Sequence, residues 1–283
     1  MRTFELLDSL SLPGDPAKPN EDAFAADNNA AVVFDGATGV GENLLPGASD
    51  AAWIAHFGAR RLMAHSRDGD VPKDALRHAL ADAEKSYRGL RKRPPKENYE
   101  IPFASMMFAA ADEGGFEALW FGDCAALVLR PDVPLEIVGE AFDKRAAEAR
   151  RVKVLADARG LAPAVSNSRA EYLPFLRASR NKVNSDAGGW LFSPDVRAAD
   201  RVTSKRIDAP SGTLVLLSTD GFLALASDYG AYDGAGLVAA VRDQGLKALG
   251  EELRAIEADD AEGRKFPRLK KNDDATAVLL RLV

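Results

Sequence analysis

The chain has 283 residues, of which 46% are hydrophobic and 28% are charged, and its formal net charge is -6 at pH 7. These proportions are ordinary for a soluble globular protein and exclude disorder over most of the length. The acidic balance argues against nucleic acid or an anionic membrane as the main partner, because both require a cationic face.

No segment reaches the length of a membrane span, and the N-terminus lacks the apolar core of a signal peptide, so the expected location is the cytoplasm. Mixed α/β layers of this size often form one core, which predicts a single domain over residues 1–283. The one cysteine, Cys124, is expected to be a small buried residue. His56, His65 and His78 have no cysteine partners at zinc-site spacing, so we interpret them as surface or interhelical residues.

Two short apolar stretches, 23–26 and 31–34, flank a polar turn and predict a β-hairpin. Asp35 follows the second stretch, which places a carboxylate at the end of a buried strand. Because the turn is short, Glu21 or Asp22 at the start of the first strand can lie near Asp35. Taken alone, the two acids at 21 and 22 are equally consistent with a solvated turn.

Helix signals follow the hairpin. Ser49 can cap one helix, and Pro72 lies in the first turn of a second. The basic run 88–96 is interpreted as an exposed linker, with a docking patch for an anionic partner as the alternative. Further strands are predicted at 3–12, 103–111, 116–120, 125–129, 190–192, 203–207, 213–219 and 275–283, and further helices at 142–160, 237–241 and 246–256.

Residues 161–189 show no clean period and are predicted to be irregular, as in a lid or an interaction loop. We place a lid-like insertion at about 140–190 within the single domain. Its Arg177, Arg180 and Lys182 could meet an anionic substrate, although surface charge is the commoner explanation for such residues.

Acidic residues recur where predicted strands begin or end. Several carboxylates brought together repel one another unless cations hold them. Oxygen ligands without histidine or cysteine select hard ions such as Mg²⁺ or Mn²⁺, and two such ions can lower the pKa of a shared water for attack on phosphorus. The acids concerned are Glu21 and Asp22, Asp35, Asp123, Asp220, and Asp273 and Asp274.

The ordered series of motifs resembles the metal-dependent protein serine/threonine phosphatases of type 2C, as a divergent bacterial-type member. The resemblance spans almost the whole chain. It implies an α+β fold, a four-layer α/β/β/α sandwich in which two antiparallel sheets pack face to face with helices outside. The motifs are Asn20-Glu21-Asp22, Val33-Phe34-Asp35-Gly36, Phe121-Gly122-Asp123, Leu217-Ser218-Thr219-Asp220-Gly221 and Asp273-Asp274-Ala275-Thr276.

By this resemblance, Asp35 would bridge two metal ions, and the carbonyl of Gly36 would be a further ligand. Glu21 would bind one ion, while Asp220 and Asp273 would bind the other. Asp35 and Asp220 are therefore the expected catalytic residues, with two Mg²⁺ or Mn²⁺ ions as cofactors.

The resemblance also implies that Asp123 helps to hold a third, weaker ion and that Asp22 orients the ligands or water around the metals.

Two departures from the family pattern concern phosphate binding and proton transfer. Family members commonly carry an arginine where this chain has Ala17, so Lys18 is the candidate phosphate-binding residue. Many also carry a histidine, proposed as general acid, where this chain has Ala37.

The first hypothesis is a phosphatase that hydrolyses phosphoserine or phosphothreonine in proteins. The alternative is a catalytically weak or inactive relative that binds a phosphoprotein or regulatory partner through residues 161–189. A third reading treats all the acids as ordinary turn residues. The physiological substrate, the preference for Ser or Thr, the choice of Mg²⁺ or Mn²⁺ and the oligomeric state are left open.

Overall fold

Two antiparallel sheets form the centre of the protein. The structure, a computed structural model, describes residues 2–140, 142, 169–266, 268 and 270–283. Within these residues, ten strands form two five-stranded sheets. The first has the order β1 (Phe4–Leu12), β10 (Ala275–Leu282), β9 (Leu214–Ser218), β6 (Ala125–Leu129) and β7 (Glu136–Val138). The second has the order β2 (Asp22–Ala26), β3 (Ala30–Gly36), β4 (Ala104–Ala111), β5 (Gly115–Phe121) and β8 (Thr203–Asp208).

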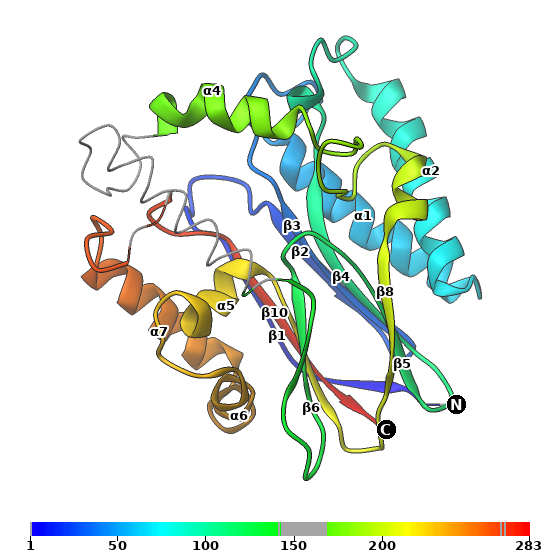
Figure 1. Cartoon of the computed structure of the whole chain (residues 1–283), viewed down its shortest axis with the longest axis vertical. Helices are drawn as coiled ribbons and strands as arrows, with labels where there is room; N and C mark the ends of the chain where they lie inside the picture. The colour runs from blue at the N-terminus through cyan, green and yellow to red at the C-terminus, as the bar shows by residue number, and fades with distance from the viewer. Residues whose placement is uncertain (1, 141, 143–168, 267, 269) are drawn as a thin grey trace.

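Helices cover the outer face of each sheet (Figure 1). The helices α1 (Asp50–Arg67) and α2 (Pro72–Leu90) pack on the second sheet. The helices α5 (Asp220–Ser227), α6 (Gly234–Gln244) and α7 (Leu246–Asp259) pack on the first. These layers confirm the predicted four-layer sandwich. The remaining helical segments of the described chain are α4 (Arg169–Arg180), η1 (Asn98–Glu100) and η2 (Val196–Arg201).

The unbroken apolar run of β3 serves two cores. Val32 and Phe34 point toward the helices, whereas Ala31 and Val33 point into the space between the sheets. Successive side chains of a strand alternate between faces, so a strand covered on both sides must be apolar at every position. The same alternation divides β4, β6, β9 and β10 between two cores.

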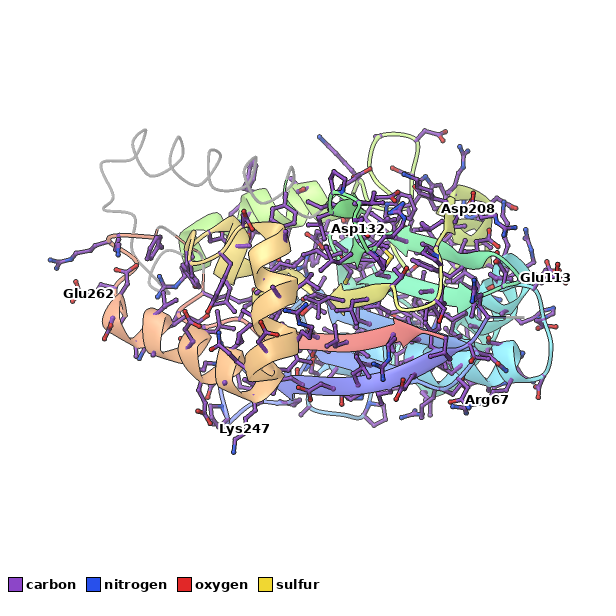
Figure 2. The ribbon with its side chains drawn as sticks, turned by 90° about the horizontal axis from the view of Figure 1, so that it is seen from below. Arg67, Glu113, Asp132, Asp208, Lys247 and Glu262 are labelled. Atoms are coloured by element: carbon purple, nitrogen blue, oxygen red, sulfur yellow. The ribbon has the colours of Figure 1, made fainter. Side chains whose placement is uncertain are left out.

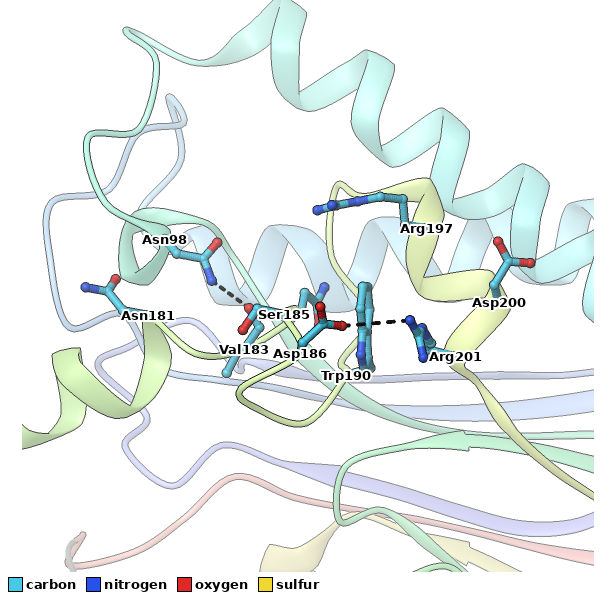
Figure 3. Close-up of a pocket in the computed structure, with 10 residues that line it drawn as sticks. Asn98, Asn181, Val183, Ser185, Asp186, Trp190, Arg197, Asp200 and Arg201 are labelled. Atoms are coloured by element: carbon cyan, nitrogen blue, oxygen red, sulfur yellow. Dashed lines mark hydrogen bonds and ion pairs between the residues drawn. The ribbon is translucent and has the colours of Figure 1, made fainter.

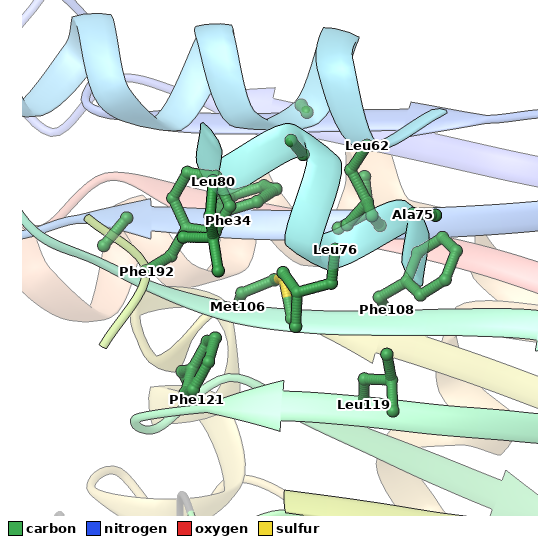
Figure 4. Packing of buried hydrophobic residues seen from close by; sticks show 14 of the residues in the cluster. Phe34, Leu62, Ala75, Leu76, Leu80, Met106, Phe108, Leu119, Phe121 and Phe192 are labelled. Atoms are coloured by element: carbon green, nitrogen blue, oxygen red, sulfur yellow. The ribbon is translucent and has the colours of Figure 1, made fainter. Parts of the chain in front are cut away.

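The helix-side core of the second sheet combines aliphatic side chains with several phenylalanines (Figure 4). Phe34 and Phe192 meet edge to face with ring centroids 5.0 Å apart. Phe108 and Leu76 are fully buried in the same cluster. At the surface, charged side chains such as Lys247 point away from the ribbon (Figure 2).

Local signals position the helices as expected. The Ser49 hydroxyl accepts a hydrogen bond from the Ala52 N–H and caps α1, and Pro72 opens α2. The predicted hairpin and strands are confirmed, with residues 190–192 reduced to a single bridge between Phe192 and Ala104. No helix in the described part of the chain has both the length and the apolar character needed to cross a bilayer.

The irregular structure predicted for 161–189 is wrong over Arg169–Arg180, where α4 forms. This helix contains Pro174 and a mixture of polar and apolar residues, which hid its period. The helix predicted at 142–160 lies almost entirely outside the described residues. Two further short elements, β7 and α5, were not predicted because neither is long enough to show a period.

Candidate metal centre

The β2–β3 ladder places Asp22 directly opposite Asp35. Asp35 follows the alternation of Ala31 and Val33, which puts it on the face toward the other sheet. Asp22 is only 1% exposed. Since like charges directly opposite destabilise a ladder, this pair of carboxylates requires positive charge nearby.

Two further acids come from the other sheet. Asp220 follows β9 as the first residue of α5 and is almost completely buried. Asp273 lies just before β10. Thr219 connects the sheets, because its hydroxyl donates to Asp22 Oδ2 at 2.8 Å and accepts from the Thr276 N–H at 3.0 Å. The ends of two strands from each sheet therefore meet at one end of the sandwich.

Asp123 lies in the turn through which the chain passes from β5 in one sheet to β6 in the other. Gly122 before it has φ +74°, and a Cβ there would lie 2.2 Å from the Ser105 hydroxyl oxygen. That turn therefore requires glycine. The Ser105 hydroxyl donates to Asp123 Oδ1 at 2.5 Å, which fixes the carboxylate beside β4.

These acids act on one another electrostatically, although no three of the described carboxylates bring an oxygen within 4.8 Å of one another. Burial, followed by the negative charges of Asp220 and Asp22, raises the pKa of Asp35 well above its ordinary value of 3.8. Asp123 and Asp273 act on the pKa of Asp35 in the same direction.

Asp22 behaves similarly to Asp35. Burial raises its pKa well above 3.8, the Thr219 hydrogen bond opposes this, and Asp273 adds to it. Cys124 is fully buried, and burial together with the charge of Asp35 raises the pKa of its thiol. The expectation of a small buried cysteine is therefore confirmed, since such a thiol is a poor nucleophile.

Lys270 is a residue of the site that the sequence analysis missed. Its ammonium lies 2.6 Å from Asp273 Oδ1. Burial lowers the pKa of Lys270, but the charges of Asp273 and Asp35 outweigh it and hold the pKa above its ordinary value. The only signal in the sequence was a lysine three residues before an acid.

Glu21 lies at the margin of the cluster. Its carboxylate accepts hydrogen bonds from the hydroxyls of Thr38 and Ser49, the latter at 2.6 Å. The neighbouring Gly36 donates its N–H to the Glu21 carbonyl at 2.9 Å. A Cβ at Gly36 would lie 2.5 Å from that carbonyl oxygen and 2.6 Å from the carbonyl oxygen of Ala51, so only glycine allows β2, β3 and α1 to approach this closely.

Asp274 has a structural role that differs from that of Asp273. Its two carboxylate oxygens accept the backbone N–H groups of Gly14 and Glu21, each at 2.7 Å. The carboxylate thereby fastens the loop between β1 and β2 to the start of β10. The sequence analysis grouped the two acids, and only the contacts separate them.

A cavity of about 730 Å³ opens beside the cluster and is lined by residues that include Lys18, Glu21, Lys270 and Asp273. Lys18 lies on the outer part of this lining, because its side chain is 75% exposed and its ammonium is 3.2 Å from Asp15 Oδ2. Asp35 is not among the lining residues, so the cavity reaches the edge of the cluster.

Two arginines of α4 reach the loop that follows β3. Arg180 donates to the carbonyl of Thr38 at 2.6 Å, and Arg177 donates to the carbonyl of Val40 at 2.8 Å. Arg177 also lies over the ring of Tyr99, 5.0 Å from its centroid. These two arginines are therefore bound to backbone and ring in this structure, and neither is a simple surface charge.

A second cavity, of about 660 Å³, lies between η2 and residues 181–190 (Figure 3). Arg201 stacks on Trp190 at 5.4 Å from the ring centroid and is 3.9 Å from Asp186 Oδ1. Its described lining includes none of the predicted metal or catalytic residues. The two cavities are therefore separate features of the molecule.

The donor set at the sandwich end fits hard divalent cations. Its side chains offer carboxylate oxygens, which Mg²⁺ and Mn²⁺ prefer. The raised pKa values of Asp22 and Asp35 follow from burial and from the neighbouring negative charges. Cations of this class would relieve the repulsion.

Comparison with known families now gives the identification. The sequence profile described as "Protein phosphatase 2C" matches residues 16–254, which is most of the chain. The chain belongs to the protein phosphatase 2C family. The matched region includes Asp22, Asp35, Asp123 and Asp220, and ends before Asp273.

Solved structures agree with this protein phosphatase 2C fold. The catalytic domain of the serine/threonine phosphatase PstP, in complex with two manganese ions, is 13% identical with a TM-score of 0.55, and each chain is covered over 100%. MsPP from Mycobacterium smegmatis, in complex with cacodylate, is 18% identical with a TM-score of 0.54 and 98% coverage of both chains. PppA from Pseudomonas aeruginosa is 18% identical with a TM-score of 0.56 and 100% coverage of both. Among curated proteins, no sequence matches this chain significantly.

Proposed function

We propose that this protein phosphatase 2C family member is a metal-dependent phosphatase that hydrolyses phosphoserine or phosphothreonine in proteins. The observation that carries the proposal is the opposed pair Asp22 and Asp35, buried at the meeting point of the two sheets among further acids. A structural role alone does not account for such a pair, because its mutual repulsion costs stability. Bound cations would remove this repulsion, and that relief would contribute to the affinity for the cations.

We assign the metal-holding role to the acids that converge there. Asp35 would be the shared ligand, and Asp220 and Asp273 would contribute from the side of the first sheet. When bound, a pair of Mg²⁺ or Mn²⁺ ions supplies Lewis-acid activation of water and of a phosphoryl oxygen. The complete proposed set is Glu21, Asp35, the Gly36 carbonyl, Asp123, Asp220 and Asp273.

The remaining residues of the site hold these ligands or meet the substrate. Thr219 donates to Asp22 and fixes the orientation of that carboxylate next to Asp35. Lys18 and Lys270 both line the cavity, so their ammonium groups can attract an incoming phosphate. The side chain of Ala37 cannot act as a general acid, so we assign protonation of the leaving alkoxide to water.

The test is Mn²⁺-dependent hydrolysis of p-nitrophenyl phosphate and of a phosphothreonine peptide. Asp35→Asn and Asp220→Asn should each reduce kcat/KM by about a hundredfold or more, because each removes a metal-binding charge. Asp132→Asn is the matched control, since it makes the same chemical change in an exposed turn at φ 58°, which asparagine also adopts. Undiminished metal-dependent turnover in both site variants would refute the assignment.

A weakly active relative that binds a phosphoprotein or regulatory partner is the second candidate. The observations that favour it are Ala37, and the pairing of Lys18 with Asp15 at 3.2 Å. In that case a phosphopeptide should bind without turnover at any Mn²⁺ concentration. Turnover at ordinary enzyme rates, roughly 1 per second or faster, would exclude it.

A further inference from the structure

A second group of metal-ligand side chains lies where α1 joins α2. His65 is in the last turn of α1, Asp70 is in the connecting turn, and His78 is in α2. Each offers a nitrogen or oxygen atom, and these three atoms all lie within 4.8 Å of one another. Among the described residues, no other group of three or more histidine, cysteine or acidic side chains meets this distance.

Asp70 stands between the two imidazoles. Its Oδ2 is 2.6 Å from His78 Nδ1 and 3.7 Å from His65 Nδ1. The two rings are tilted against each other, with a centroid distance of 5.3 Å and an interplanar angle of 54°. The three ligand atoms are therefore close neighbours, and because a carboxylate only accepts, His78 Nδ1 carries a proton toward Asp70 that a bound metal ion would replace.

The other side of His65 is oriented by a carboxylate. Its Nε2 lies 2.8 Å from Asp82 Oδ2, and Arg61 Nε donates to the same oxygen at 2.7 Å. A carboxylate only accepts hydrogen bonds, so Nε2 carries a proton. In the neutral imidazole this leaves the lone pair on Nδ1, the nitrogen that faces Asp70. A histidine held in this way by a carboxylate is the usual arrangement behind a metal ligand.

The group is remote from the carboxylate cluster. α1 begins at Asp50, beside Ser49 and Glu21, and runs away from that end of the sandwich (Figure 1). From Asp50 to His65 the helix rises roughly 22 Å at 1.5 Å per residue. A ligand set of two imidazoles and one carboxylate also differs in kind, since imidazole favours zinc-like ions over Mg²⁺ and Mn²⁺.

We propose that His65, Asp70 and His78 bind one zinc-class divalent cation, with solvent completing the coordination. His78 is 54% exposed, which leaves the group open to ions and water. The bound ion would join the end of α1 to α2 across the turn. It would thus strengthen the helix pair that covers the second sheet.

The competing reading is an ion-pair network of charged imidazoles and carboxylates, without affinity for metal. Calorimetric titration of the full chain with Zn²⁺, in excess Mg²⁺ to occupy the hard-ion centre, separates the two. The proposal expects one site that is lost in His78→Gln and retained in His56→Gln. His56 is the matched control because it is an exposed histidine on the same α1.

A spectroscopic readout identifies the ligands directly. With Co²⁺ as the probe, hyperfine-shifted imidazole signals should appear in the proton NMR spectrum of the wild type and be absent in His78→Gln. Asp82→Asn should weaken affinity by roughly 10- to 100-fold without abolishing it. His65→Gln provides the second ligand test, and circular dichroism verifies that each variant is folded. Zn²⁺ binding that is equal in the wild type and in folded His78→Gln and His65→Gln would overturn the proposal.

Discussion

Asp22 and Asp35 form a buried pair of carboxylates that costs stability, which the proposed metal role would explain. The hairpin register places them opposite each other, and Thr219 holds Asp22 from the other sheet. Each contact reduces conformational freedom while leaving the two carboxylates in mutual repulsion. Among the described residues, the Lys270 ammonium against Asp273 offsets part of this repulsion, and the proposed cations would offset more of it.

The first residue-scale prediction concerns Gly36. Gly36→Ala should lower the free energy of unfolding by roughly 1–3 kcal/mol, because its Cβ would lie 2.5 Å from the Glu21 carbonyl oxygen. Gly39→Ala is the matched control in the same loop, since its Cβ would meet only Asn43 Oδ1 at 3.7 Å. Urea unfolding followed by circular dichroism measures both. Equal midpoints for the two variants would contradict the close approach at Gly36.

The second residue-scale prediction concerns pH. The Arg93 guanidinium, with a hydrogen bond from the Lys96 N–H, lowers the pKa of Glu100 from 4.5 to about 2. A lowered pKa contributes stability above the unfolded value of 4.5, and this is lost as pH falls from 4.5 toward 2. Glu100→Gln should therefore be less stable than the wild type at pH 7, and the difference should shrink below pH 4.5.

Urea midpoints at pH 7, 5 and 3.5 measure this difference. Glu113→Gln is the control, because Glu113 is exposed at the tip of a hairpin (Figure 2). A gap between wild type and Glu100→Gln that stays constant with pH would show that Arg93 does not hold the carboxylate in solution.

At the scale of elements, α4 supports the loop that follows β3. Arg180 donates to the Thr38 carbonyl, and the Thr38 hydroxyl donates to Glu21, so the helix is linked to a proposed metal ligand through one residue. The same loop is also anchored elsewhere, since the Ala37 N–H donates to the Phe103 carbonyl and the Leu44 N–H donates to Asp50. α4 therefore contributes one part of the support of this loop, at Thr38 and Val40.

Arg180→Ala should weaken Mn²⁺ affinity by roughly tenfold, because a hydrogen bond from a charged group contributes about 1.5–3 kcal/mol and only part of it reaches Glu21. Arg88→Ala is the control, since Arg88 pairs with Glu84 on the surface of α2. Isothermal calorimetry with Mn²⁺ measures both variants. Unchanged affinity in Arg180→Ala would mean that the loop keeps its position without α4.

Elements with continuous apolar runs could be predicted from the sequence, because burial on both faces makes most positions of β3, β9 and β10 apolar. The helix α4 could not, since Pro174 and mixed composition obscure its period. Short β7 and α5 carry too few residues for any pattern.

At the scale of the whole molecule, two sheets bring distant chain segments to one end of a sandwich. The acids at strand ends could be predicted to converge because their order along the chain resembles that of a known family. Contacts made by tertiary packing could not be predicted, as for Lys270 with Asp273 or His65 with Asp82. In the sequence these residues look like ordinary surface residues, and their pairing is determined only when the helices and loops pack.

The most direct test of the central claim is a calorimetric titration with Mn²⁺ joined to phosphopeptide hydrolysis on the same samples. The account predicts about two sites in the wild type and in Asp132→Asn, with turnover that rises as the sites fill. Asp35→Asn should lose both the binding and the turnover, because it removes the shared ligand. Full Mn²⁺ binding in folded Asp35→Asn, or turnover that is independent of metal, would contradict the account.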